Sequence, residues 1–162
     1  MTGQGPLALT GTGPSRHDEN VTSKIILGVD GSLHSERAVR WCAAHAPALG
    51  AEVVVVHAID VPVSLAMGPY YAYPELTPEQ REALGDDVAR EWCKPLADAG
   101  VSYRVVVMEG SPAAAIIQTA HNEQAELVVA GRRGRGGFAE LLLGSTSHQL
   151  SHHLDRPLVI VP

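Results

Sequence analysis

A glycine- and arginine-rich segment near the end of the chain is the strongest candidate for chemistry. It reads Gly131-Arg132-Arg133-Gly134-Arg135-Gly136-Gly137. Four glycines in seven residues weaken a structure unless the backbone adopts a positive φ or approaches a ligand closely. Consecutive amide N–H groups in such a loop form an anion-binding nest, and three arginines add positive charge. This composition favours phosphate as the ligand.

A predicted helix start lies ten residues beyond Gly134, at Gly144-Ser145-Thr146. Free N–H groups, the helix dipole and two hydroxyls all favour a phosphate there. The segment is not a Walker loop, because GxxxxGK[ST] does not occur, nor a dinucleotide fingerprint, which would follow the first strand. The glycines alone leave a tight structural connection open. Together with the helix start they favour phosphate binding.

Asp30 is the second candidate, because it follows the first β-branched run of the chain. An aspartate at this place either caps the following helix or contacts a ligand. Ligands bind beyond the carboxyl ends of parallel strands, where neighbouring connections diverge. If the first and fourth strands are neighbours, Asp30 faces the glycine segment, and this convergence favours a binding role.

The elements that must position these residues alternate regularly between strands and helices. Apolar runs predict strands at 24–30, 51–60, 101–109, 126–131 and 157–162. Cap signals and apolar spacing predict helices at 32–49, 77–99, 111–123 and 144–154. The run at 51–60 is apolar on both faces, as in a strand buried between helical layers. We therefore predict an α/β fold, a three-layer sandwich of five parallel strands with helices on both faces.

Length and charge limit the classes of function. The 162 residues and 17.1 kDa fit one domain at 24–162, preceded by a flexible arm at 1–23 without a secretory signal. A net charge of −6 argues against nucleic acid as a partner. No apolar run reaches the roughly 18 residues of a membrane span. Two isolated cysteines, Cys42 and Cys93, suit the reducing cytoplasm.

Other polar and aromatic residues have simpler interpretations. His148, His152 and His153 lack a carboxylate or cysteine at matching spacing, so we interpret them as a helix end and predict no metal site. His57 is interpreted as a histidine of the core or of the site's edge. Trp92 fits the apolar face of a helix and is predicted to lie in the core.

The pattern G-x2-G-x9-G-[ST] is satisfied by Gly131, Gly134, Gly144 and Ser145. The opening KIILGVDGS, the run VVVVHAID, the EGSP turn at 109–112 and the ending HHLDRPLVIVP occur in order around it. With these motifs, residues 24–162 resemble the universal stress protein family. The resemblance implies the strand order 3-2-1-4-5, which makes the first and fourth strands neighbours. It also implies the branch that binds ATP, with Mg²⁺.

By position, the resemblance assigns Asp30 to the ribose or phosphate region and Gly28 and the Ala58 backbone to the adenine. It also implies that Gly131 and Gly134 wrap the phosphates, while Ser145 and Thr146 donate to them. Gly110, at the end of the third strand, is a peripheral candidate. A cluster of tyrosines at 70, 71 and 73 is either a lid over the adenine or a loop packed on its own prolines.

Two residues depart from the family pattern. Arg132 stands where a small residue is commoner, so its side chain either reaches the phosphates or crowds the loop. Thr146 stands where family members frequently have valine, and this change is tolerable.

These observations predict an ATP-binding regulatory or sensor module of the stress response, whose nucleotide state governs partner binding or oligomeric state. The resemblance also implies a homodimer formed through the last strand, Pro157 to Pro162. A weak ATP hydrolase or an adenylyl- or phosphoryl-transfer enzyme is one alternative, although no acidic strand end or base supports it. A nucleotide-free dimeric interaction protein is the other.

Overall fold

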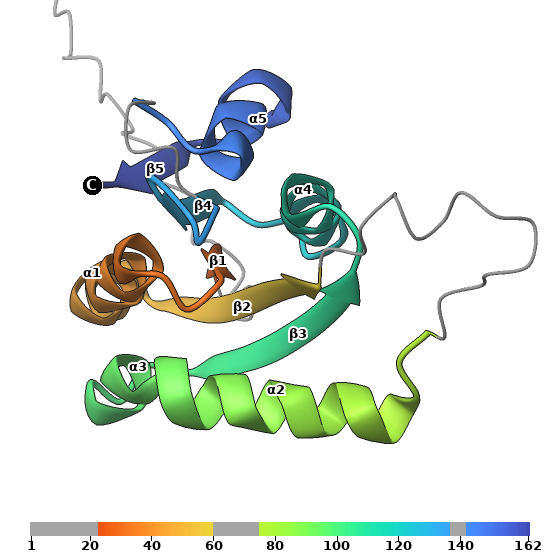
Figure 1. The fold of residues 1–162 in the computed structure, drawn as a ribbon. Coiled ribbons are helices and arrows are strands. Elements are labelled where there is room, and N and C mark those ends of the chain that lie inside the picture. The colour runs from red at the N-terminus through yellow and green to blue at the C-terminus, as the bar shows by residue number, and fades with distance from the viewer. Residues whose placement is uncertain (1–22, 60–74, 137–141) are drawn as a thin grey trace, which may run out of the picture.

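Five parallel strands form the centre of the fold, in the order β3-β2-β1-β4-β5 (Figure 1). They are β1 (Ser23–Val29), β2 (Ala51–Ile59), β3 (Tyr103–Glu109), β4 (Leu127–Gly131) and β5 (Leu158–Val161). The structure is a computed structural model that describes residues 23–59, 75–136 and 142–162. It confirms the predicted sheet and places β1 beside β4, as the site requires.

Helices cover both faces of this sheet (Figure 1). They are α1 (Leu33–Leu49), α2 (Pro78–Trp92), α3 (Lys94–Asp98), α4 (Pro112–Asn122) and α5 (Ser145–His153). The first three pack on one face, while α4 and α5 pack on the other. The predicted three-layer sandwich is therefore confirmed.

Strand β2 shows why the sheet sits between two helical layers. Val53 and Val55 belong to the core under α1, α2 and α3, whereas Val54 and Val56 belong to the core under α4 and α5. All four are at most 1% exposed. Burying one such side chain stabilises the fold by about 1.5–3 kcal/mol, so neither face of this strand tolerates a polar residue.

The cap signals of the sequence act as predicted at two helices. The Ser32 hydroxyl accepts the Ser35 N–H at the start of α1, and Gly50 ends that helix with a left-handed φ of 58°. At the start of α2, Thr77 and Gln80 form a reciprocal capping box. Each cap satisfies a backbone group that the helix end leaves without a partner.

The single helix predicted at 77–99 is wrong. The chain instead forms α2 and the short α3, with Cys93 between them at φ −94° and ψ 5°. Pro95 lies in the first turn of α3. Proline has no amide hydrogen and its ring collides with the preceding turn, so Pro95 favours the first turn of a new helix over the interior of a continuous one.

Several predictions concern residues outside the described ones. These are the arm, apart from Ser23, which begins β1; the tyrosines at 70, 71 and 73; and Gly137.

A charged network joins β1, β2, β3 and the end of α4 at the amino edge of the sheet. Glu123 Oε2 lies 2.7 Å from both Lys24 Nζ and Arg104 Nη2, and Arg104 Nε lies 3.3 Å from Glu52 Oε1. Hydrogen bonds from Lys24 and then Arg104 lower the pKa of Glu123 below its ordinary value of 4.5. The folded chain therefore holds this carboxylate ionised more strongly than the unfolded chain does.

We expect Glu123→Gln to lower the free energy of unfolding by about 1 kcal/mol at pH 7, because the network is partly exposed. A lowered folded-state pKa stabilises the fold above the unfolded pKa, and that contribution disappears as the pH falls through the folded value. In urea denaturation, the difference in unfolding free energy between wild type and Glu123→Gln should therefore disappear as the pH falls below 4.5. Glu126→Gln, at an exposed carboxyl, is the control. A pH-independent difference would contradict the prediction.

Candidate functional site

Asp30 and the glycine loop, which we define as residues 131–136, meet at the carboxyl edge of the sheet. Strands β1 and β4 pair with Gly28 opposite Ala130. The chains that leave them converge, and Asp30 Oδ2 accepts the N–H of Arg135 at 2.9 Å. Asp30 Oδ1 accepts the Ser32 N–H at 3.0 Å. The predicted convergence of these two segments is thus present, with a direct contact across 105 positions of the chain.

Ser32 adds a second contact between the glycine loop and the start of α1. Its hydroxyl donates to the carbonyl oxygen of Arg133 at 3.2 Å while accepting the N–H of Ser35. The backbone N–H of Asp30 in turn donates to the Ser35 hydroxyl. Asp30 therefore organises the turn before α1 and holds the glycine loop, but the N-cap of α1 is Ser32 and not Asp30. Contact of Asp30 with a ligand stays a prediction.

The start of α5 is fixed to the same loop. The N–H of Gly144 donates to the carbonyl of Arg132 at 2.9 Å, and the buried hydroxyl of Ser147 donates to that same oxygen at 2.7 Å. Gly144 is the N-cap of α5, and no side chain caps this helix. Ser145 and Thr146 form its first turn, where backbone N–H groups attract anions.

Gly134 shows how closely the loop approaches Asp30. A Cβ built on Gly134 would collide with Asp30 Oδ2. Any larger residue would push the carboxylate away and break its bond to Arg135. The close approach of the Asp30 carboxylate to the loop backbone, rather than a positive φ, explains this glycine.

The remaining predicted residues are less closely grouped. Gly28 faces α4, since its Cβ would lie 2.5 Å from Ile116 Cδ1. Ala58 is half-buried against the same helical layer. Gly110 lies at the end of β3, two strands from β1, where its N–H donates to the carbonyl of Ile59. Gly136 is exposed, and a Cβ added to it would have no neighbour within 4 Å.

Trp92 is part of the site's surroundings, although the sequence placed it only in the core. Its ring packs on the core under α1, α2 and α3, and the Arg135 guanidinium carbon lies 5.6 Å from the ring centroid. The ring also leaves no room for a side chain at Gly31, where φ is +76°. The rings of His57 and Trp92 lie edge to face with their centroids 5.1 Å apart, and His57 is half-buried. The structure thus places His57 between the core and the surroundings of the site.

His34 is a residue of the site that sequence reasoning did not consider. It lies in the first turn of α1, and its backbone lies directly against Gly131. Partial burial lowers the pKa of His34, and the positive charge of Arg133 lowers it further. The position of the residue, four places after Asp30 in a helix that starts at the site, is a signal that was present in the sequence.

Neither a metal site nor a membrane span has support among the described residues. In ranges 23–59, 75–136 and 142–162, no three His, Cys, Asp or Glu side chains are grouped to hold a metal. The rings of His148 and His152 lie 4.6 Å apart on an exposed face of α5. Nor does any helix in those ranges combine the length and the apolar character needed to cross a membrane.

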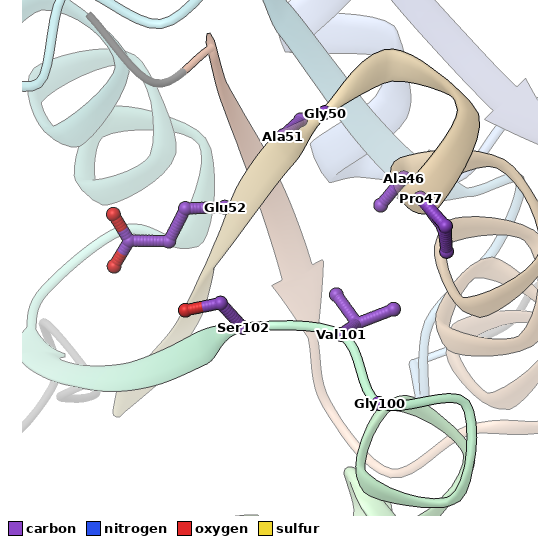
Figure 2. A pocket seen from close by; sticks show the side chains of 8 residues that line it. All are labelled: Ala46, Pro47, Gly50, Ala51, Glu52, Gly100, Val101 and Ser102. Atoms are coloured by element: carbon purple, nitrogen blue, oxygen red, sulfur yellow. The ribbon is translucent and has the colours of Figure 1, made fainter. Parts of the chain in front are cut away.

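A pocket of about 220 Å³ lies at the opposite end of the sheet from the glycine loop (Figure 2). It is formed by the end of α1, the start of β2 and the turn before β3. Ala46, Pro47 and Val101 line one side, and the Glu52 carboxylate points away from them. Neither a guanidinium nor a helix start faces it among the lining residues. The donors suited to phosphate are instead at the carboxyl edge.

Comparison with known proteins decides the family. A model of the universal stress protein family matches residues 22–162. The chain belongs to this family. A universal stress protein of Thermus aquaticus is 36% identical over 139 residues, covering 85% of this chain and 96% of that protein. One from Mycolicibacterium smegmatis is 34% identical over 143 residues, and this chain spans about half of its length, 47%.

Solved universal stress proteins share the fold. One in complex with cAMP is 24% identical, with a TM-score of 0.63 over 86% of this chain and 96% of that one. The protein of Archaeoglobus fulgidus in complex with dAMP is 17% identical, with a TM-score of 0.61 over 88% and 98%. At these identities the likeness establishes the arrangement of the elements in this universal stress protein.

Proposed function

We propose that this universal stress protein binds ATP, together with Mg²⁺, at the carboxyl edge of β1 and β4. The contact between Asp30 and the Arg135 amide carries the proposal, because it brings the end of β1 and the glycine loop to one place. The neighbours in complex with cAMP and dAMP support an adenine nucleotide as the ligand.

The groups at this edge fit the two ends of such a ligand. A carboxylate has about four acceptor positions, of which the two backbone amides on Asp30 use two, so ribose hydroxyls have acceptors there. Loop amides, the uncapped start of α5 and the Arg135 guanidinium are donors suited to phosphate. Bound Mg²⁺ would supply charge neutralisation of the phosphates.

We further propose that the nucleotide regulates binding of a partner or self-association in the cytoplasm, as a sensor of the stress response. The cysteines suit that compartment: both are buried and unpaired. Burial raises the pKa of Cys42 to about 12 and that of Cys93 to about 11, so both stay protonated. Within the described residues nothing favours hydrolysis or group transfer over binding.

We expect Mg-ATP to raise the melting temperature of nucleotide-free protein. At a ligand concentration 100 times Kd the stabilisation is about 2.7 kcal/mol, or about 5–10 °C for a domain of this size. Differential scanning fluorimetry measures it, with Mg²⁺ alone and inorganic phosphate as controls. A protein that shows no rise at millimolar Mg-ATP would contradict the proposal and favour the nucleotide-free interaction protein.

Ser145→Asp locates the site in the same assay. Aspartate in the first turn of α5 is favourable to the helix dipole but repels phosphate, so the free protein keeps its stability while the ATP-induced rise shrinks. Ser151→Asp is the matched control, because Ser151 is an exposed serine near the other end of α5. Equal ATP-induced rises in the two variants would place the nucleotide elsewhere.

A further inference from the structure

The three arginines of the glycine loop differ in how their side chains are placed. Arg132 and Arg133 are half-buried, and their carbonyl oxygens accept hydrogen bonds from Ser147 and Ser32. Arg135 is exposed and lies between Gly134 and Gly136. Of the three guanidinium groups, that of Arg135 is therefore the most accessible to a ligand in solution.

The exposed Arg135 guanidinium rests on an aromatic ring rather than on a carboxylate. Its central carbon lies 5.6 Å from the centroid of Trp92. Asp30 is bonded to the backbone N–H of Arg135 and not to its side chain. Among the described residues, no Asp or Glu forms a salt bridge with this guanidinium. Its charge is therefore not neutralised by an acidic side chain there.

A phosphate would compete effectively with the Trp92 ring for this group. An exposed cation–π contact is a weak interaction. A guanidinium binds phosphate through two parallel, charge-assisted hydrogen bonds, which are stronger and directional. The flanking glycines allow the loop backbone to adjust while the guanidinium changes partner.

Polyphosphates need this group more than monophosphates do. The backbone N–H groups of the loop and of the start of α5 can bind one phosphate group without a cationic side chain. Each further phosphate makes the ligand more negative, and the chain, whose net charge is −6, then repels it more strongly. A local cation must offset that repulsion, and Arg135 is the accessible one in the loop.

We propose that Arg135 selects polyphosphate nucleotides over monophosphates by leaving the Trp92 ring for a phosphate beyond the first. This inference rests on the proposed nucleotide site and names the ligand class that the site prefers. When no polyphosphate is bound, the Arg135 guanidinium stays in contact with the Trp92 ring. Arg135 is thus a specificity-determining residue.

Calorimetric titration of ATP and AMP into the full chain tests the selectivity. EDTA is present, so that Mg²⁺ does not neutralise the phosphates. Arg135→Ala should weaken ATP binding about tenfold, and AMP binding less than twofold. Arg90→Ala is the matched control, because Arg90 is an exposed arginine on the same helix as Trp92 and pairs with Asp87. It should leave both affinities unchanged.

Fluorescence of Trp92 tests the movement separately. The chain has two tryptophans, so Trp41→Phe leaves Trp92 as the only one. ATP should move the emission spectrum of this variant toward that of ligand-free Trp41→Phe/Arg135→Ala. AMP should leave it unchanged, and ATP should not alter the double variant.

The outcomes separate this inference from the proposed function. If Arg135→Ala weakens ATP and AMP equally, or leaves ATP affinity unchanged, the selectivity is overturned while the nucleotide site stands. If ATP binds but Trp92 emission does not change, the movement of Arg135 is overturned. Wild-type protein that binds neither nucleotide, whether EDTA or Mg²⁺ is present, overturns the proposed function and this inference together.

Discussion

Gly131→Ala is expected to lower the stability of the fold by about 3 kcal/mol, or the melting temperature by about 6–12 °C. A Cβ at this position would lie 2.6 Å from the carbonyl carbon of His34 and 2.8 Å from the N–H nitrogen of Ser35. Both atoms belong to the backbone of the first turn of α1, which cannot move aside as a side chain can.

The displacement would also reach the proposed site. Ser35 accepts the N–H of Asp30, and Ser32 connects the same turn to the glycine loop, so moving the turn disturbs both. Gly136→Ala is the matched control, because nothing lies within 4 Å of its Cβ position. Thermal unfolding of the two variants measures the difference. If Gly131→Ala melts within about 2 °C of wild type, close packing of α1 on β4 is not the reason for this glycine.

Ile160→Asp is expected to convert the homodimer that the family resemblance implies completely into monomer. Strand β5 pairs with β4 on one side only and is therefore an edge strand. Its residue Ile160 is half-buried in the single chain and belongs to neither core cluster, unlike Val159 and Val161. In a twofold interface one substitution places two carboxylates close together in an apolar contact.

Light scattering of the purified protein measures this change. Wild type should have twice the 17.1 kDa mass of one chain, and the variant that single mass. Leu49→Asp is the control, because Leu49 is 53% exposed at the far end of α1 and receives the same charge. A wild-type monomer, or an Ile160→Asp dimer of unaltered mass, would contradict assembly through β5. Val161→Asp is unsuitable, since this side chain is 9% exposed within the core.

Local patterns were sufficient for most of the fold. The β-branched runs of β1 and β2 and the caps at Ser32 and Thr77 act within a few residues, so periodicity and cap signals identify them. The order of the strands depends on contacts far apart in the chain and came from the family resemblance. The break at Cys93 depends on one proline, which outweighed an otherwise helical pattern.

The site was predictable in its position but less so in its details. Asp30 and the glycine loop follow neighbouring strands, and topology then brings them together. Helical spacing shows which face of α2 is buried, yet it does not show that the Trp92 ring extends to Arg135 and Gly31. The family resemblance assigned Gly28 to the adenine. The structure shows a different reason for a small residue there, since a side chain at this position would collide with Ile116.

The pairing of β1 with β4 has a consequence for how the protein is made. Strand β1 is near the start of the chain, and its partner begins at Leu127, after β2 and β3 have been synthesised. Chains emerge from the ribosome amino end first, and such long-range pairings form slowly. The proposed nucleotide site can therefore not exist on a nascent chain until β4 and the start of α5 have emerged. Any stabilisation by ligand acts on the finished protein and not on its early intermediates.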